Sequence, residues 1–240
     1  MNPESYPNLE FDDQHLENIM QIYESKWICK QLNNDFSVLD LGYGSGIVCK
    51  SLSAAGKEVT VVDGALEFAT QASKISYHVE EFDEFRYVKG VHSLFEEFET
   101  AETFDCVIAS FILEHVKEPI KLLKRCHNWS KKIIVVVGNA NSLHRQIAVE
   151  MGLQKDIYAL SERDHKVGHY MVYDHELLLK HLDASGWEVE KTEGFFVKPL
   201  NNARMKDWEP ELIHALNRVK ILPEISANIG VVCHPKRPLS

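Results

Sequence analysis

The stretch Val38-Leu39-Asp40-Leu41-Gly42-Tyr43-Gly44-Ser45-Gly46 decides the fold of this chain. Its first half is apolar, as is typical of a buried strand, and its second half places three glycines at alternate positions. Because glycine has no side chain and tolerates positive φ, a glycine-rich turn after a strand lets the backbone approach a ligand. By itself the pattern fits either a cofactor-binding turn or merely a tight turn.

Short strand-like runs alternate with helical segments on both sides of this turn. Strands are predicted at 37–41, 58–62, 86–91, 104–109 and 132–137. Helices are predicted at 15–33, 46–55, 65–75 and 118–129. Such alternation requires a parallel sheet covered by helices on both faces, which is a doubly wound α/β fold. The run Ile133-Ile134-Val135-Val136-Val137 has no polar alternation and indicates a strand buried on both sides.

The segment 139–173 follows this fifth strand and is too long for a plain connection. It is rich in His, Arg and Tyr, and we expect a helical insertion that forms a lid. Asp174 is expected to cap the next helix, and strands at 187–197 and 227–233 then flank a helix near 209–220. We find no internal repeat or linker. The sequence therefore predicts one domain over 1–240, with an N-terminal helical cap at 1–35.

The amino-acid composition argues against several classes of binding partner. The chain has 36 acidic and 26 basic residues, for a net charge of −10, which argues against non-specific binding to nucleic acid or anionic lipid. Its five cysteines are scattered and form no C-x-x-C pair, so neither a disulfide framework nor a metal site is indicated. No run is long and apolar enough to predict a membrane span. We expect a soluble cytoplasmic protein, and the sequence leaves a homodimer open.

Three further features raise the odds of a cofactor site at the glycine turn. Asp40 is a carboxylate inside an apolar strand, where it needs a donor partner. Asp63, followed by Gly64, ends the second strand about 20 residues after the turn, where a carboxylate can accept hydrogen bonds from both ribose hydroxyls of an adenosine cofactor. The fourth strand carries Ser110, Glu114 and His115 off its end into the expected cleft.

The segments VLDLGYGSG, VTVVD and FDCVIASFILEHV, taken in this order and spacing, resemble the class I S-adenosylmethionine-dependent methyltransferases. The resemblance covers roughly residues 16 to 138. The later stretch GHYMVYDHELLLKHLDASGWEV resembles the branch that includes the quinone-biosynthesis O-methyltransferases and small-molecule tailoring enzymes. The resemblance implies a Rossmann-like, mostly parallel seven-stranded sheet with an antiparallel closing strand. It also implies S-adenosylmethionine as cofactor and S-adenosylhomocysteine as product.

The resemblance assigns cofactor contacts by position. It places the three glycines of the turn beside the methionine and ribose portions, and Asp63 with Gly64 at the ribose; Asp40 would order the loop. Many relatives carry an acidic residue where the third strand ends, but this chain has His92-Ser93-Leu94, so Ser93 and the backbone of Leu94 are the replacements that we expect. The remaining cofactor candidates flank the sulfonium end, where aromatic faces attract a cation, and are Ser110, Phe111, Tyr23 and Trp27. For Tyr23 and Trp27 a plain core role fits equally well.

The acceptor should lie under the insertion. Methyl transfer is an in-line displacement that can use a general base, and histidine suits this role near neutral pH. We rank His144 and His169 before His115 as candidates. Basic and polar side chains in the insertion suggest a small, anionic acceptor; they are Arg145, Arg163, His165, Lys166 and Tyr173. The alternative is a solvated helix face on which Glu162 and Asp164 pair with these charges.

Two rival functions remain at this point. A nicotinamide-dependent oxidoreductase also uses a glycine turn, but its G-x-G-x-x-G fingerprint separates the last two glycines by three positions, whereas Gly44 and Gly46 are two apart. A non-catalytic cofactor-binding protein, acting as a sensor or partner subunit, would keep the turn and Asp63. The polar insertion favours an enzyme, because a scaffold has no evident need for several histidines and arginines over the cleft.

Overall fold

The computed structural model of the chain describes residues 2–9, 11–79 and 84–237 and contains a seven-stranded sheet. The strand order is β5-β2-β1-β6-β7-β9-β8, and β9 runs antiparallel to both of its neighbours while the other pairs are parallel. The strands are β1 (Ser37–Leu41), β2 (Glu58–Asp63), β5 (Lys89–His92), β6 (Cys106–Ser110), β7 (Ile133–Gly138), β8 (Trp187–Phe195) and β9 (Asn228–Pro235). The predicted doubly wound sheet with an antiparallel closing strand is confirmed.

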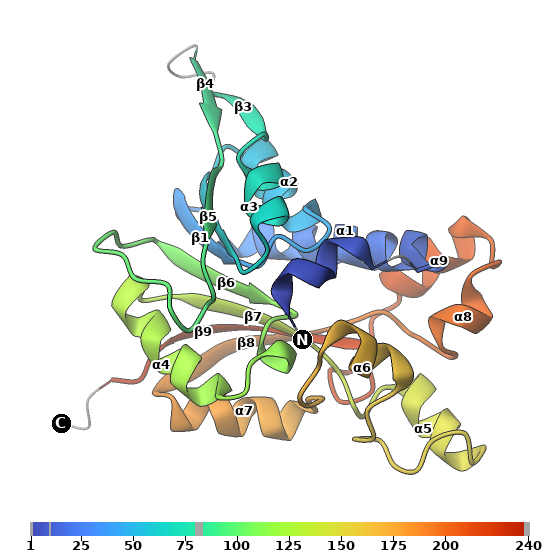
Figure 1. The fold of residues 1–240 in the computed structure, drawn as a ribbon. Helices are drawn as coiled ribbons and strands as arrows, with labels where there is room; N and C mark the ends of the chain where they lie inside the picture. The colour runs from blue at the N-terminus through green and yellow to red at the C-terminus, as the bar shows by residue number, and fades with distance from the viewer. Residues whose placement is uncertain (1, 10, 80–83, 238–240) are drawn as a thin grey trace.

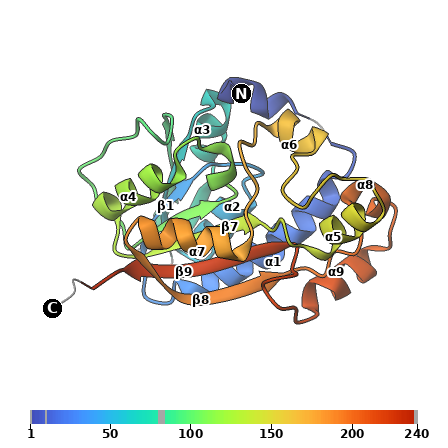
Figure 2. The same ribbon diagram turned by 90° about the horizontal axis from the view of Figure 1, so that it is seen from below.

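Helices cover both faces of this sheet (Figures 1 and 2). The helices are α1 (Gln14–Gln31), α2 (Ile47–Ala54), α3 (Leu66–Ala72), α4 (Pro119–Trp129), α5 (Leu143–Glu150), α6 (Glu162–Val167), α7 (His175–Ala184), α8 (Asn202–Met205) and α9 (Pro210–Arg218). Helices α4 and α7 pack on one face, and α1 and α2 pack on the other. Asp174 caps α7 as predicted, because its Oδ1 accepts a hydrogen bond from the Leu177 N–H at 2.7 Å. In the described ranges, none of these helices has the length and apolar character needed to cross a membrane.

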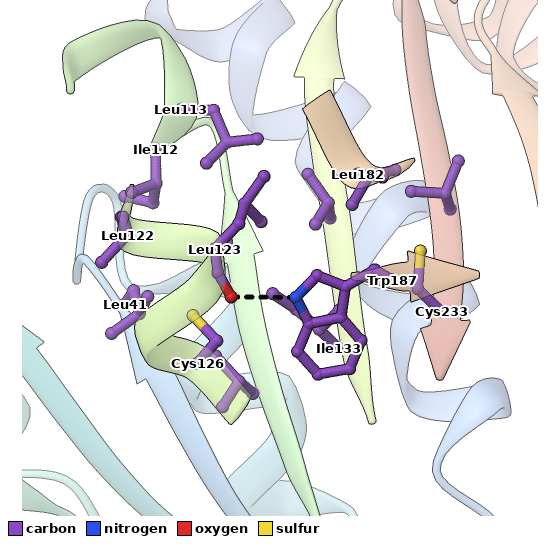
Figure 3. Packing of buried hydrophobic residues seen from close by; sticks show 14 of the residues in the cluster. Leu41, Ile112, Leu113, Leu122, Leu123, Cys126, Ile133, Leu182, Trp187 and Cys233 are labelled. Atoms are coloured by element: carbon purple, nitrogen blue, oxygen red, sulfur yellow. Dashed lines mark hydrogen bonds between the residues drawn. The ribbon is translucent and has the colours of Figure 1, made fainter. Parts of the chain in front are cut away.

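The core explains why the fifth predicted strand is so apolar. All five residues from Ile133 to Val137 are fully buried, since β7 is covered on both faces. Trp187 at the start of β8 fills the layer between β7 and α4, and its indole N–H donates to the Leu123 carbonyl at 2.9 Å (Figure 3). Trp187 thus packs helix α4 against the face of the sheet opposite α1, and its one polar atom has a hydrogen-bond partner.

The run predicted as one strand at 86–91 is divided in the structure. Its second part forms β5, while its first part belongs to an antiparallel hairpin, β3 (Ser76–Val79) with β4 (Glu84–Tyr87), that projects from the body (Figure 1). The prediction of a single strand was wrong because Tyr87, an exposed aromatic residue inside the predicted run, resembles an apolar residue of a buried strand.

The insertion 139–173 leaves and rejoins the sheet at one point. Asn139 and Tyr173 form an isolated parallel bridge, and the Ala140 N–H donates to the Tyr173 carbonyl at 2.5 Å. Between these points the insertion contains α5 and α6, as the sequence predicts helices there. Within the segment expected as an N-terminal helical cap, a short 3-10 helix, η1 (Pro3–Asn8), precedes α1 and lies beside α3 and near α6 (Figure 2).

Candidate functional site

A cavity of about 1960 Å³ opens at the carboxyl ends of β1, β2 and β6. The chain order of the strands reverses between β1 and β6, which is where doubly wound sheets bind ligands. Ligand pockets commonly measure roughly 300–1,000 Å³, so this cavity has room for two molecules. We call the part lined by residues that follow β1, β2, β5 and β6 the strand-end half. The part lined by η1, the insertion and residues 198–204 is the roof half.

The glycine turn forms one wall of the strand-end half. Gly42, Gly44 and Gly46 all have positive φ, at 85°, 52° and 74°. A Cβ at Gly42 would lie 2.5 Å from the Ile112 side chain, and one at Gly46 would lie 2.5 Å from the Tyr43 hydroxyl. A Cβ at Gly44 would meet nothing within 4 Å, and Gly44 lines the cavity. Close packing therefore requires glycine at positions 42 and 46. Gly42 also lines the cavity together with Gly44, whereas Gly46, which the resemblance placed beside the cofactor, is not part of the lining.

Asp63 ends β2 and holds the turn in place. Its Oδ2 accepts a hydrogen bond from the Tyr43 backbone N–H, and its Oδ1 accepts one from the Ala65 N–H, both at 2.8 Å. Burial raises the pKa of this carboxyl. Asp63 and Gly64 both line the cavity. Because each carboxylate oxygen keeps a second lone pair, Asp63 can order the turn and still accept hydrogen bonds from a ligand.

Asp40 lies beneath the turn and is 2% exposed. Its Oδ2 is buried and has no hydrogen-bond partner within the described part of the chain. Burial, and after it the charge of Asp63, raise the pKa of Asp40 to about 8. An unpartnered buried carboxyl is costly, and Asp40 lines the cavity. A ligand that brings a positively charged or hydrogen-donating group would remove that cost.

The end of β5 differs from the expectation. Leu94 lines the cavity, but Ser93 is absent from the lining; its hydroxyl donates to the Leu94 carbonyl at 3.0 Å. Glu96, which sequence reasoning missed, is exposed and lines the cavity only three residues beyond Ser93. An acidic side chain is therefore available near the position where the resemblance implies one. Searching the whole loop rather than the strand end alone would have found it.

The four residues expected at the sulfonium end of the cofactor fall into two groups in the structure. Ser110 and Phe111 line the cavity, and Phe111 has a positive φ of 55°, a strained conformation for an aromatic residue. Tyr23 and Trp27 do not line it. The Tyr23 hydroxyl is 3.2 Å from Nδ1 of His214, and the Trp27 ring packs against Phe195 with centroids 5.3 Å apart. Trp27 therefore belongs to the core, Tyr23 contacts α9 as a half-buried residue, and the structure gives no support to a cofactor contact for either.

A pair of side chains from the insertion faces the roof half. Nδ1 of His169 lies 2.9 Å from Oδ1 of Asp164, and both residues line the cavity. Although burial opposes it, hydrogen bonds from His169 and Ser161 hold the pKa of Asp164 well below its usual range. The ring of His115 meets that of His169 edge to face, with centroids 4.6 Å apart. Asp164 is thus an ionised carboxylate that fixes one nitrogen of His169.

Burial lowers the pKa of the other two predicted bases, His115 and His144. Burial, and then the nearby His169, lower the pKa of His115 to about 4. Burial, and then Lys198 and Arg145, lower the pKa of His144 to about 2. Both histidines line the cavity and are neutral near neutral pH. Neutral imidazoles with such low pKa values are weak proton acceptors.

The two arginines predicted to bind the acceptor already have partners within the protein. Arg163 binds both carboxylate oxygens of Asp13 at 2.7 Å, and its guanidinium lies 4.1 Å from the centroid of the Phe11 ring. Arg145 donates to the carbonyls of residues 157 and 159 and lies 3.7 Å from Asp164. Part of the charge pairing expected as the alternative is therefore present, because Asp164 lies beside Arg145. Arg163, however, pairs with Asp13 and Glu17, and these pairs line the cavity instead of covering a solvated helix face.

The remaining predicted substrate residues lie at the edge of the site or outside it. His165 and Lys166 are exposed and line the cavity. Tyr173 is fully buried outside the lining, and its hydroxyl lies 3.1 Å from Nδ1 of His181. Two further lining residues, Tyr6 in η1 and Lys198 after β8, gave no local sequence signal because neither belongs to a motif.

Comparisons with known proteins agree with this geometry. A family model described as a methyltransferase domain matches residues 17–192. The ubiquinone biosynthesis O-methyltransferase of Actinobacillus pleuropneumoniae serotype 7 is 26% identical over 202 residues, which cover 81% of this chain and 83% of that protein. The protein of the same description from Aliivibrio fischeri strain MJ11 is 32% identical over 94 residues, which cover 39% of each chain.

Among solved structures, the 1,6-didemethyltoxoflavin-N1-methyltransferase of Burkholderia thailandensis was determined with 1,6-didemethyltoxoflavin and S-adenosylhomocysteine bound. It matches with a TM-score of 0.61 and 15% identity, covering 97% of this chain and 84% of that one, which shows a shared fold. The family model spans more than half of the 240 residues and includes the glycine turn, Asp63 and the end of β6. The chain therefore belongs to the methyltransferase-domain family and is a class I S-adenosylmethionine-dependent methyltransferase.

Proposed function

We propose that this methyltransferase acts on a hydroxyl oxygen of a small molecule that binds in the roof half of the cavity. The observation that carries the proposal is the Asp164–His169 pair, which faces the same cavity as the glycine turn and Asp63. A hydroxyl must lose a proton as it is methylated, and a paired histidine can accept it. The ubiquinone biosynthesis relatives are O-methyltransferases by name, which supports an oxygen acceptor.

The residues of the strand-end half fit S-adenosylmethionine. The unpartnered Oδ2 of Asp40 is suited to an amino group, the second lone pairs of Asp63 to ribose hydroxyls, and the open backbone at Gly44 to a close approach. Bound S-adenosylmethionine supplies an electrophilic methyl group on a sulfonium. Ser110 and the strained Phe111, at the end of β6, line the cavity, where the resemblance implies the sulfonium end of the cofactor.

His169 is the base that this arrangement favours. Its Nδ1 is held by Asp164, so its Nε2 is the nitrogen that can accept a proton from the acceptor. The negative charge of Asp164 stabilises the imidazolium that forms. The protein otherwise has to align the hydroxyl oxygen with the methyl group, and the roof half lines the space in which the acceptor would lie.

The direct test compares His169→Ala with His78→Ala, which changes an exposed histidine of β3 that does not line the cavity. The assay is S-adenosylhomocysteine formation with a panel of phenolic and catechol acceptors. We expect kcat of the His169 variant to fall by about 10²–10⁴-fold, with unchanged affinity for S-adenosylhomocysteine, while the control stays near wild type. Native turnover by His169→Ala would remove the base. Tight cofactor binding by a wild-type protein that methylates no acceptor would favour the non-catalytic sensor or partner.

A further inference from the structure

Lys198 is a positively charged residue of the roof half that no sequence motif indicated. It follows β8, lines the cavity, and has no hydrogen-bond or ion-pair partner among residues 2–9, 11–79 and 84–237. Burial lowers the pKa of this amine, and the carboxylates of Glu17 and Asp13 oppose that effect. A partly buried ammonium group without a partner is unfavourable, so Lys198 is suited to receive an anion.

The other buried cations of the roof half cannot fill this role. Arg163 has Asp13 at 2.7 Å and Glu17 at 3.4 Å, so its charge is matched within the protein. Arg145 has Asp164 and two backbone carbonyls as partners. Displacing Asp13 from Arg163 by a ligand would leave a buried carboxylate unpaired, and displacing the carbonyls from Arg145 would leave backbone acceptors unpaired. Lys198 can bind an anion without that cost.

His144 on α5 shares this region with Lys198. Its Nδ1 is buried and has no hydrogen-bond partner in the described part of the chain, and the charge of Lys198 is one of the causes that keep its imidazole neutral. A neutral imidazole carries one N–H, which can donate to an anion. Lys198 and His144 together therefore offer one positive charge and one neutral donor to the cavity.

We propose that Lys198 and His144 bind a carboxylate of the acceptor, while His169 receives the proton of its hydroxyl; the acceptor is then a hydroxycarboxylic acid. This inference rests on the proposed O-methylation. The one positive charge of Lys198 equals the charge of a carboxylate, whereas a phosphate dianion is usually bound by paired arginines or a helix N-terminus. Both arginines that could form such a pair are already neutralised by carboxylates.

The test uses the full chain saturated with S-adenosylhomocysteine, so it needs no turnover. Calorimetry compares 3,4-dihydroxybenzoate with 3,4-dihydroxybenzamide, which has the same shape and no charge, and with phenyl phosphate. We expect wild type to bind the acid about tenfold more tightly than the amide, and Lys198→Met to lose this preference. Lys198→Arg should retain it. Lys180→Met, which removes an exposed lysine of α7, makes the same charge change away from the cavity and should behave as wild type.

Several outcomes overturn the proposal. A wild-type protein without preference for the acid over the amide has no carboxylate site, whether or not the variants fold. A preference that persists in Lys198→Met assigns the anion to another residue, and tighter binding of phenyl phosphate than of the acid excludes a carboxylate site. If Lys198→Met also loses affinity for S-adenosylhomocysteine, the result for Lys198→Arg is used instead. Loss of the preference for the acid over the amide in Lys198→Arg overturns the assignment of Lys198 to the carboxylate. Failure of the O-methylation proposal appears separately, as absent S-adenosylhomocysteine formation in wild type.

Discussion

The two halves of the cavity are built in different ways. In the strand-end half, Asp63 binds the backbone of Tyr43 and of Ala65, residues 20 and 2 positions away along the chain. In the roof half, Arg163 binds Asp13, which is 150 positions away. Topology and backbone groups thus create the first half, whereas pairs of side chains from distant segments create the second. The difference implies that changes in one half should alter cofactor binding and changes in the other should alter acceptor chemistry.

The largest effect should follow Asp63→Asn, which removes the charge and leaves only one acceptor for two backbone N–H groups. We expect the Kd for S-adenosylhomocysteine to rise about 100-fold, because a buried charged hydrogen bond is lost and a donor is left unsatisfied. Calorimetry measures this, and Glu67→Gln on the exposed side of α3 is the control. Unchanged affinity would disprove the assignment of Asp63 to the cofactor.

Asp164→Asn should alter the roof half alone. As a positioning residue, Asp164 holds Nδ1 of His169, so kcat should fall by at least about tenfold while the acceptor KM and the affinity for S-adenosylhomocysteine stay near wild type. The double variant that combines Asp164→Asn with His169→Ala should have the same kcat as His169→Ala alone, because both substitutions disable the same proton acceptor. Additive losses would show that Asp164 acts only on stability.

The strand-end half should also bind cofactor in a pH-dependent way. Without ligand, burial keeps Asp40 protonated below its pKa of about 8. The positively charged amino group of S-adenosylhomocysteine favours the carboxylate, so binding should release a proton. Affinity should rise with pH up to 8, by about tenfold per pH unit in the limit of full release.

Calorimetry at pH 6, 7 and 7.5, in two buffers with different ionisation enthalpies, measures both the affinity and the number of protons released. Asp40→Asn should bind with no such pH dependence. Wild-type binding that releases no proton in this range would show that Asp40 is already ionised, or that it does not interact with the cofactor.

The smallest effect should come from Arg163→Met, which removes the tie between the insertion and the start of α1. Because the arginine side chain is 35% exposed, we expect a loss of only about 1 kcal/mol in the free energy of unfolding. The acceptor KM should rise a few-fold while cofactor affinity stays constant. Lys121→Met, which breaks an exposed pair with Glu118, is the control in denaturant titrations. A large loss of cofactor affinity would contradict the separation of the two halves.

The sequence predicted most of the sheet because each strand carries its own signal. The five β-branched residues of β7 and the alternation of strands and helices required the observed architecture. The hairpin β3–β4 escaped prediction because its exposed aromatic residues resemble core residues, and the bounds of η1 escaped because six residues are too few to show a helical periodicity. Local patterns report local structure, and they fail where a segment is held only by contacts with distant residues.

The same limit applies to the candidate site. Asp40, Gly44 and Asp63 line the cavity because strand ends meet at one edge of a parallel sheet. Tyr23 and Trp27 lie on a helix whose amphipathic pattern could not tell which side faces the ligand. Lys198 was missed, and Asp164 appeared only as a partner on a solvated face, because their roles depend on pairings formed after folding. Whether these lining residues bind and react as assigned stays a prediction.

The bridge between Asn139 and Tyr173 has a practical consequence for protein engineering. A segment whose two ends meet can be exchanged as a cassette, since its replacement by one of similar length hardly changes the entropy of closing the loop. The sheet keeps its register on either side of such a graft, because β7 and α7 are anchored by their own contacts. New acceptor specificities could therefore be transplanted between related enzymes at these two residues, provided that each graft keeps a partner for Asp13.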